Sequence, residues 1–438
     1  MTPRALAVRA LVRQEQSGYA NLVWDTALKR CEPPLSARDA AFAASIFYTT
    51  MEHLNLLDWC LERFSKKPVS KLDPPVRAIL RAGLAQARWM QVPVPAAVNE
   101  SVKLTRVMGK ASASGMVNAV LRRAAALQVS ETDFAEPFDK LVIYHSLSEP
   151  VARLLLDQYG KEALAMMTAF EKTDAGQETA IRVNPLQTSD EALTAELEAE
   201  HCTVRSGPWP HSLLVRFPAS PAAVQPFSRG YFHVQGIPSQ FAALCVEARP
   251  GDRVWDCCAA PGGKSLTLAE SMRNEGRLLC SEMAPNRVRL IEKALVRCGI
   301  TCADAVCADA VSSKYGIFDR ILCDVPCSGL GIIAKKPDIR YKSLDQLETL
   351  VTVQQKILEN AAEALAENGR LVYSTCTVNE QENQKQIERF LQNHPDFAVA
   401  APSLNWPGVR DTGFGSLFLP HETGTDGFFV CILKKNLA

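Results

Sequence analysis

The strongest constraint on the fold is an alternation of short apolar runs with helical segments in the second half of the chain. The runs are RVWDC (253–257), RLLCSE (277–282), DRILCD (319–324) and GRLVYSTC (369–376). Buried parallel strands have this apolar character because helices cover both faces of their sheet. The pattern predicts an α/β, doubly wound, Rossmann-like domain over residues 236–438. Ligands bind such sheets outside the carboxyl ends of the strands.

Residues 1–132 are predicted to form an all-α bundle of five to seven helices. Apolar residues recur there at steps of three and four, or multiples of these, as on one face of a helix. These residues are Ile46, Leu54, Leu57, Leu61 and Phe64. Pro74 and Pro75 predict the start of another helix, because proline is tolerated in a first helical turn.

Residues 133–235 are predicted to form a small α+β connector domain. The runs ETAIRVNP, LLVRF and YFHVQ have strand character and surround the helical segment SDEALTAELEAE. Short strands mixed with one helix are typical of this class. The chain is therefore expected to be multidomain, with three parts.

The formal charge of zero is unevenly distributed. Residues 1–130 hold 18 Lys and Arg against 9 Asp and Glu, a net charge of +9, and the remainder carries −9. A basic segment suggests a surface that binds RNA or DNA, because neutralising phosphates supplies much of the affinity for nucleic acids. A solvated basic surface without a partner explains the charge equally well.

The 14 cysteines predict neither a disulfide framework nor a metal site. Disulfides are rare in long chains without an export signal, and no cysteine pair has the C-x-x-C spacing of structural zinc sites. Most of these thiols should be small buried side chains. With no signal peptide and no apolar stretch of about 18 residues, we expect a cytoplasmic protein that binds neither a membrane nor a metal.

The first motif with chemical content is DCCAAPGGKS, which begins at Asp256. Its two glycines turn the chain from a strand into a helix that starts near Lys264, so backbone N–H groups can approach a ligand closely. Glu282 ends the next expected strand, where an acid suits the ribose hydroxyls of a nucleoside cofactor. The motif is neither a dinucleotide fingerprint nor a phosphate loop, and a tight turn without a ligand would look similar.

Two further motifs place thiols at the ends of expected strands. CDVPCSGLG carries Asp324 and Cys327, and VYSTCTVNEQEN carries Cys376. Asn379 and Glu382 have the spacing of a capping-box variant, so we expect a helix to begin there and its dipole to favour the Cys376 thiolate. Taken singly, each cysteine is more often an inert buried residue.

Together the motifs supply what methylation of cytosine at carbon 5 requires. Carbon 5 is a poor nucleophile until a thiolate adds to carbon 6, and an acid must bind the base edge around N3 and N4. A base then removes the carbon-5 proton and the thiol leaves. Two thiols and one carboxylate meet these needs, although spacing alone does not say which thiol attacks.

The same residues resemble a known family. D-C-C-A-A-P-G-G-K, D-V-P-C-S-G and S-T-C-T, with PDIR and the terminal DGFF, are similar to the Nol1/Nop2/Sun family of RNA 5-methylcytosine methyltransferases. RVNP (182–185) and GYFHVQ (230–235) resemble its connector, and VNESVKL and VNAVLRR resemble a NusB-like RNA-binding domain. This combination is typical of the bacterial small-subunit ribosomal RNA methyltransferase B group. The resemblance covers nearly the whole chain and implies methylation of a cytosine in 16S ribosomal RNA with S-adenosyl-L-methionine.

Carried over residue by residue, the resemblance implies a role for each site residue. Cys376 would be the nucleophile and Cys327 would assist product release. Asp324 would lie between cofactor and cytosine, Glu282 would bind the ribose hydroxyls, and Asp309 would contact the adenine. The rest of the cofactor would be lined by Cys258, Ala259, Ala260, Pro261, Gly262, Gly263 and Lys264.

The chain departs from the family at two positions that matter. Ala308 precedes Asp309 where the family has glycine, and Gly236 follows Gln235 where the family has aspartate. The first change affects the adenine loop, and the second affects the connector's contact with the active site.

Alternatives remain open at this stage. One is the same chemistry on transfer RNA, and another is a non-catalytic RNA-binding factor with a methyltransferase-like scaffold. A scaffold has no need to keep Cys327, Asp324 and Cys376 together. A DNA cytosine methyltransferase is disfavoured, because the family resemblance assigns the nucleophile to the T-C cysteine and DNA enzymes use the P-C cysteine.

Overall fold

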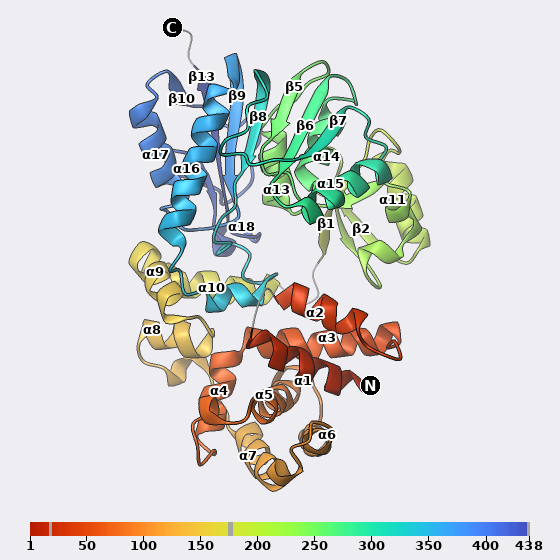
Figure 1. Ribbon diagram of the computed structural model, residues 1–438, viewed down its shortest axis with the longest axis vertical. Helices are drawn as coiled ribbons and strands as arrows, with labels where there is room; N and C mark the ends of the chain where they lie inside the picture. Colours follow the sequence, from red (N-terminus) through yellow and green to blue (C-terminus); the bar gives the residue numbers. More distant parts are fainter. Residues whose placement is uncertain (17–19, 174–177, 436–438) are drawn as a thin grey trace. The chain divides into compact units, whose positions relative to one another are not determined.

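The computed structural model describes residues 1–16, 20–173 and 178–435, and its contacts divide the chain into two compact units. One unit comprises Met1–Met167 with Lys335–Leu344, and the other comprises Thr168–Ala334 with Asp345–Ala438. Figure 1 shows the chain coloured along the sequence, from the N-terminal helices in red to the strands of the large sheet in green and blue. The predicted fold classes and their order are confirmed. The domain borders at residues 132 and 235 stay predictions.

The N-terminal part of the first unit is all helical, as predicted. Pro74 and Pro75 open α5 as expected. The helices are α1 (Pro3–Gln14), α2 (Ala20–Lys29), α3 (Ala37–Glu52), α4 (Leu54–Glu62), α5 (Pro74–Trp89), α6 (Val94–Val107) and α7 (Ser114–Ala126). The apolar stripe from Ile46 to Phe64 is not one helix, because the backbone leaves the helical range at His53, between α3 and α4. Both helices bury their apolar side chains in the same core, so the periodicity continues across the break.

The helices after residue 130 pack with this first unit. They are α8 (Pro137–Asp139), α9 (Glu149–Tyr159) and the first part of α10 (Glu162–Thr173). The Asn55 side chain donates hydrogen bonds to the carbonyls of Val142 and Leu147, both at 2.9 Å. These bonds satisfy carbonyls in and just after a π-helical turn at Lys140–Tyr144 and tie this turn to α4.

A distant segment, Lys335–Leu344, also belongs to the helical unit by its contacts. It contains the 3₁₀ helix of the PDIR sequence. The Tyr341 hydroxyl donates to the Met51 carbonyl at 2.6 Å, and the Arg340 guanidinium donates to the His145 carbonyl at 2.7 Å. A stretch of chain between two elements of the large sheet domain is therefore anchored among the N-terminal helices.

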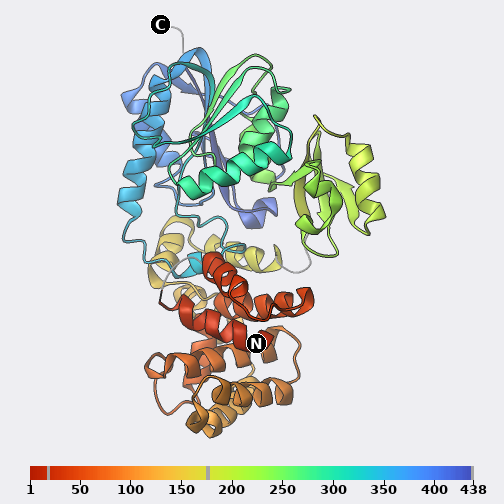
Figure 2. The same cartoon turned by 45° about the vertical axis from the view of Figure 1, so that its right-hand side comes forward.

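The connector is an antiparallel sheet with the strand order β2-β3-β1-β4. Figure 2 shows it as a lobe beside the larger sheet of the same unit. Its elements are β1 (Thr179–Val183), α11 (Asp190–Ala199), β2 (Thr203–Ser206), β3 (Ser212–Arg216), α12 (Gln225–Ser228) and β4 (Phe232–Val234). The predicted strand runs and helix are present, and β2, which is mostly exposed and lacks an apolar run, was not predicted.

The C-terminal part is a nine-stranded sheet with the order β11-β12-β13-β9-β8-β5-β6-β7, and β10 pairs with β13. Five adjacent strands are parallel: β5 (Arg253–Asp256), β6 (Arg277–Glu282), β7 (Ala303–Cys307), β8 (Phe318–Asp324) and β9 (Leu365–Thr375). The antiparallel strands are β10 (Phe397–Val399), β11 (Arg410–Asp411), β12 (Ser416–Phe418) and β13 (Phe428–Lys435). The four predicted strands are confirmed, and β7 and the antiparallel strands are additional.

Helices surround this sheet as the doubly wound prediction requires (Figure 1). They are α13 (Ile237–Leu244), α14 (Gly263–Ser271), α15 (Pro285–Arg297), α16 (Leu347–Glu363), α17 (Gln384–Asn393) and α18 (Pro420–Thr423). Helices α14 and α15 pack on β6, and α16 packs on β8 and β9. The strand order reverses between β5 and β8, which is where such folds open a ligand crevice. In the described part of the chain, no helix has the length and apolar character needed to cross a membrane.

Candidate active site

The predicted site residues follow parallel strands that are neighbours in the sheet. β5 pairs with β6 and β8, and β8 pairs with β9. Asp324 and Ser374 are register partners at the ends of β8 and β9. The carboxyl ends of these strands share one edge, so Asp256, Glu282, Asp324 and Cys376 lie along the same side of the sheet.

The glycine-rich turn closes directly after β5. Gly262 adopts φ +108°, a left-handed conformation that strongly favours glycine, and α14 begins at Gly263. Burial raises the pKa of Asp256 at the start of the turn to about 7, and the Ser265 hydroxyl donates to its carboxylate at 2.7 Å. The turn thus leads directly into a helix N-terminus at Gly263, as the sequence predicted for a cofactor loop.

Glu282 faces this turn from the end of β6. Its carboxylate accepts the Ala284 N–H at 3.0 Å and lies 3.2 Å from the Arg287 guanidinium. Arg287 also donates to the Ala260 carbonyl at 2.9 Å, which links the acid to the glycine-rich turn. Glu282 is only 7% exposed, and a carboxylate has acceptor capacity beyond these bonds for a pair of hydroxyls.

Asp309 lies in the loop after β7, beside the end of β6. The Ala308 N–H donates to the Glu282 carbonyl at 3.0 Å, so the loop is held next to the acid despite its alanine. The Asp309 carboxylate accepts the Val311 N–H at 2.9 Å and is exposed. The loop that carries Asp309 therefore lies beside the strand end that carries Glu282.

Asp324 is held by two partners that the sequence analysis did not assign to it. The Lys264 ammonium lies 2.7 Å from one carboxylate oxygen, and the Ser374 hydroxyl donates to the other at 2.8 Å. Lys264 comes from the glycine-rich motif. This ion pair therefore connects the glycine-rich turn with the loop that carries Asp324 and Cys327, which we call the D-x-P-C loop. Ser374 could have been identified as a site residue from the sequence, because it stands two residues before Cys376 at the end of the same strand.

The two thiols of the later motifs meet. The Sγ atoms of Cys327 and Cys376 lie 3.1 Å apart, and both residues are partly exposed. The hydrogen bond to Cys376, together with burial, raises the pKa of the Cys327 thiol well above its ordinary value. Cys327 is therefore a protonated thiol at neutral pH and can donate its hydrogen to Cys376.

The predicted helix start after Cys376 is wrong. Helix α17 begins at Gln384 rather than at Asn379, so Cys376 does not adjoin a helix N-terminus and the dipole argument fails. Asn379 and Glu382 do bond to each other, at 3.0 Å, but both are completely buried. Their polar atoms are used for contacts between loops instead of for starting a helix.

The connector contacts the cofactor turn through Gln235. Its side chain accepts the Thr267 hydroxyl at 2.9 Å and donates to the Gly263 carbonyl at 3.3 Å. Gly236 is the N-cap of α13 and contributes no side chain. The missing carboxylate at Gly236 therefore does not remove the connector's link to α14.

All 14 cysteines carry unbridged thiols, and nine of them are buried. The prediction that most are small buried side chains is confirmed. Cys257 and Cys323 form a second close pair, with Sγ atoms 3.6 Å apart, and burial raises the pKa of Cys257. Such thiols are poor nucleophiles because the thiolate is the reactive form.

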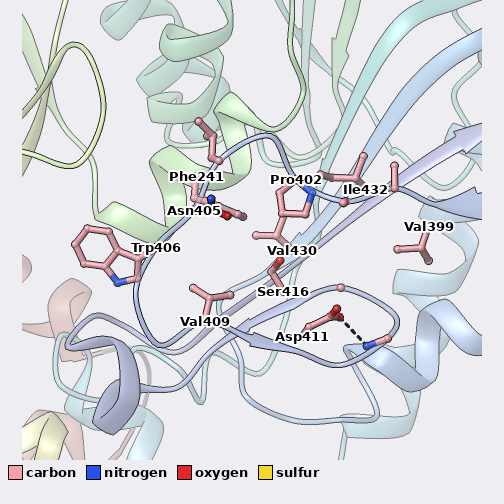
Figure 3. A pocket seen from close by; sticks show the side chains of 15 residues that line it. Phe241, Val399, Pro402, Asn405, Trp406, Val409, Asp411, Ser416, Val430 and Ile432 are labelled. Carbon is pink, nitrogen blue, oxygen red and sulfur yellow. Dashed lines mark hydrogen bonds between the residues drawn. The ribbon is translucent and has the colours of Figure 1, made fainter.

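A separate pocket of about 420 Å³ is formed by α13 and the C-terminal segment (Figure 3). Its lining includes Phe241, Trp406 and Ile432, and the Asp411 carboxylate beside it accepts the Gly413 N–H at 2.8 Å. None of the predicted site residues lines it. We therefore assign it no part in the reaction.

Comparisons with known proteins identify the families that this chain resembles. Residues 243–434 match the family described as 16S rRNA methyltransferase RsmB/F, and residues 1–126 match the NusB family. The probable ribosomal RNA small subunit methyltransferase B of Bacillus subtilis (strain 168) is 33% identical over 447 residues, covering 99% of this chain and 98% of its own.

Two solved structures share the fold. PH0851 is 24% identical, with a TM-score of 0.81 over 99% of both chains. NSun6 from Pyrococcus horikoshii with SFG is 23% identical, with a TM-score of 0.60 over 65% of this chain and 97% of its own. At these identities the likeness concerns the fold alone.

Proposed function

Because the chain belongs to the RsmB/F family of 16S rRNA methyltransferases, we propose that it methylates carbon 5 of a cytosine in small-subunit ribosomal RNA. It is an RNA methyltransferase, and its cofactor is S-adenosyl-L-methionine. The cytosine, the carbon-5 position and the covalent intermediate are our proposals. A ribosomal RNA substrate would place the enzyme in the cytoplasm.

The residues around the glycine-rich turn fit this cofactor. Gly262 adopts the left-handed backbone conformation that closes the turn, and the Arg287 side chain links the turn to the buried carboxylate of Glu282. We assign the ribose hydroxyls to Glu282, the adenine to Asp309, and the methionine and ribose part to Cys258–Lys264. Asp324 would border both cofactor and base. When bound, the cofactor supplies an electrophilic methyl group.

The chemistry of the base falls to three side chains. The Cys376 thiolate adds to carbon 6, forming a C–S bond and shifting an electron pair toward carbon 5 and N3. Asp324, held by Lys264 and Ser374, binds the base edge around N3 and N4. After methylation a solvent water acts as the base that takes the carbon-5 proton, the C5–C6 double bond re-forms from that C–H electron pair, and the C–S bond breaks to expel the Cys376 thiolate. We assign assistance in this release to Cys327, because its sulfur lies beside that of Cys376.

One observation carries the proposal: two thiols within 3.1 Å at the edge of a cofactor-binding sheet that also presents Asp324. Bisulfite sequencing of small-subunit ribosomal RNA from cells with and without the protein tests it. We expect one cytosine to lose its protection when the gene is absent and to regain it with the wild-type gene, but not with Cys376→Ala. Protection lost in transfer RNA alone, or in no RNA, would overturn the proposal.

A further inference from the structure

One buried carboxylate joins the two loops that carry the thiols. Glu382 is completely buried and lies between β9 and α17. Its carboxylate accepts the Ser328 N–H at 2.7 Å, the Ser328 hydroxyl at 2.5 Å, the Gln354 amide at 2.9 Å and the Asn379 amide at 3.0 Å. Each carboxylate oxygen thus receives two hydrogen bonds. A buried anion needs this degree of satisfaction to be stable.

The bonded groups adjoin the two cysteines in sequence. Ser328 follows Cys327, and Thr377 follows Cys376. The Ser328 and Thr377 hydroxyl oxygens lie 2.7 Å apart. Because the Ser328 hydroxyl donates to Glu382, its oxygen accepts the hydrogen of Thr377. The residue after each thiol is therefore fixed by one directional chain that ends on the Glu382 carboxylate.

Further hydrogen bonds hold the Glu382 backbone and the residue before Cys327. The Tyr373 hydroxyl donates to the Glu382 carbonyl at 2.7 Å. Gln354 on α16, also completely buried, donates its other amide hydrogen to the Pro326 carbonyl at 2.9 Å. Cys327 is consequently held from both sides, through Pro326 and through Ser328. The D-x-P-C loop and the T-C loop cannot shift relative to one another without breaking bonds to this cluster.

We propose that Glu382 is a positioning residue for the thiol pair: it holds the two loops in the register that keeps the Cys327 and Cys376 sulfur atoms in contact. The consequence for catalysis rests on the proposed function, in which one thiol attacks and the other assists release. Loss of the carboxylate would let the loops separate, so attack and release would no longer occur at one base. The burial of Glu382 excludes a direct contact with substrate.

The geometric part can be tested on the full-length protein without RNA or cofactor. Dibromobimane alkylates two nearby thiols, forming two C–S bonds and releasing two bromide ions. Peptide mapping by mass spectrometry identifies the link between Cys327 and Cys376. The readout is the ratio of cross-linked to singly alkylated product, which separates thiol spacing from thiol reactivity.

The informative variant is Glu382→Gln, which has nearly the same shape. An amide nitrogen in place of one oxygen would face the Ser328 N–H and the Gln354 amide, which are both donors. In place of the other oxygen it would face the Asn379 amide donor and force the Ser328 hydroxyl to become an acceptor, which reverses the hydroxyl chain. We expect the cross-link ratio to fall by roughly tenfold, as the loss of buried hydrogen bonds of this kind implies. Glu380→Gln is the matched control, because Glu380 lies in the same loop but pairs with Lys385. Its ratio should equal that of the wild type.

An unchanged ratio in Glu382→Gln would overturn the inference. The melting temperature and the affinity for S-adenosylhomocysteine check that each variant is folded. If Glu382→Gln does not fold, Thr377→Val and Ser328→Ala break the hydroxyl chain and leave the carboxylate intact. Both should then lower the ratio, and wild-type ratios in both would refute the positioning role.

Methylation kinetics distinguish this inference from the proposed function. We expect Glu382→Gln to lower kcat while leaving the KM for RNA near the wild-type value, because the base still binds. If the wild-type enzyme modifies some atom other than carbon 5 of cytosine, the proposed function fails. A lowered cross-link ratio would still stand as evidence for Glu382.

Discussion

The sulfur atoms of Cys327 and Cys376 lie 3.1 Å apart, although one thiol follows β8 and the other follows β9. The pairing depends on the parallel register of these neighbouring strands, which places both loops at one edge of the sheet. A protonated Cys327 can donate its hydrogen to a Cys376 thiolate. This arrangement suits a nucleophile at Cys376 and an assisting thiol at Cys327.

Glu282 should determine much of the cofactor affinity. Glu282→Ala removes an acid assigned to the ribose hydroxyls, and charge-assisted hydrogen bonds contribute about 1.5–3 kcal/mol, or roughly ten- to a hundredfold in affinity. Calorimetry with S-adenosylhomocysteine measures the effect. Glu292→Ala, at an exposed position on α15, is the control and should bind normally. Wild-type affinity in Glu282→Ala would mean that the ribose lies elsewhere.

Asp256 should make the folded protein less stable as the pH rises. Its pKa is about 7 in the folded chain because of burial, against an ordinary value of 3.8. Between these values the unfolded chain has lost the proton and the folded chain keeps it, so stability falls with increasing pH and levels off above about pH 7. Asp256→Asn lacks this titration. The melting temperature of the wild type relative to Asp256→Asn should therefore decline from about pH 4 to about pH 7, and a constant difference would refute the assignment.

A buried ion cluster should stabilise the junction between connector and α14. Both the Arg182 guanidinium and the His233 ring lie 3.3 Å from the Glu270 carboxylate, whose side chain is completely buried. Removing one partner leaves buried charge uncompensated, which typically costs about 3–5 kcal/mol. Glu270→Ala should accordingly lower the melting temperature markedly in calorimetry. Glu275→Ala, at an exposed site just beyond α14, should leave it unchanged. If Glu270→Ala melted at the same temperature as the wild type, the cluster would contribute no net stability.

The basic helical surface should supply RNA affinity. Arg106 on α6 and Arg122 and Arg123 on α7 are exposed, and these two helices pack together. Substitution is a cleaner test than deletion, because deleting the helices would also remove the partners of Tyr341. Replacing all three arginines by alanine should weaken RNA binding, and each lost phosphate contact should lower the slope of log K against log salt by a little under one unit.

A salt titration of RNA binding measures both quantities, with S-adenosylhomocysteine affinity as the control for an intact cofactor site. Unchanged affinity and slope would show that this part of the surface is only solvated. The charge of residues 1–130 would then have to act through other positions or have no partner.

Strand prediction succeeded where side chains are buried on both faces. The run RLLCSE coincides with β6, whose last five residues are all buried. In contrast, β2 is mostly exposed, and its residues have no apolar run to detect. The break between α3 and α4 was missed because Ile46 and Leu57 enter the same core from two helices.

The position of the site was predictable, and its internal contacts were not. Residues such as Asp324 and Cys376 stand at strand ends, so topology alone places them at one edge. The bonds of Asp324 with Lys264 and of Gln235 with Thr267 join segments far apart in sequence. Glu382 was misread as a helix cap, because a local motif does not reveal that its partners come from another loop and from α16.

The assignment of roles to the two thiols is tested most directly by trapping the covalent RNA adduct. The enzyme is mixed with labelled RNA and S-adenosyl-L-methionine and run on a denaturing gel. Cys327→Ala should accumulate an RNA adduct, because attack survives and release does not. Cys376→Ala should form none and should not methylate. An adduct with Cys376→Ala and none with Cys327→Ala would reverse the assignment, and no adduct with either variant would contradict the covalent mechanism.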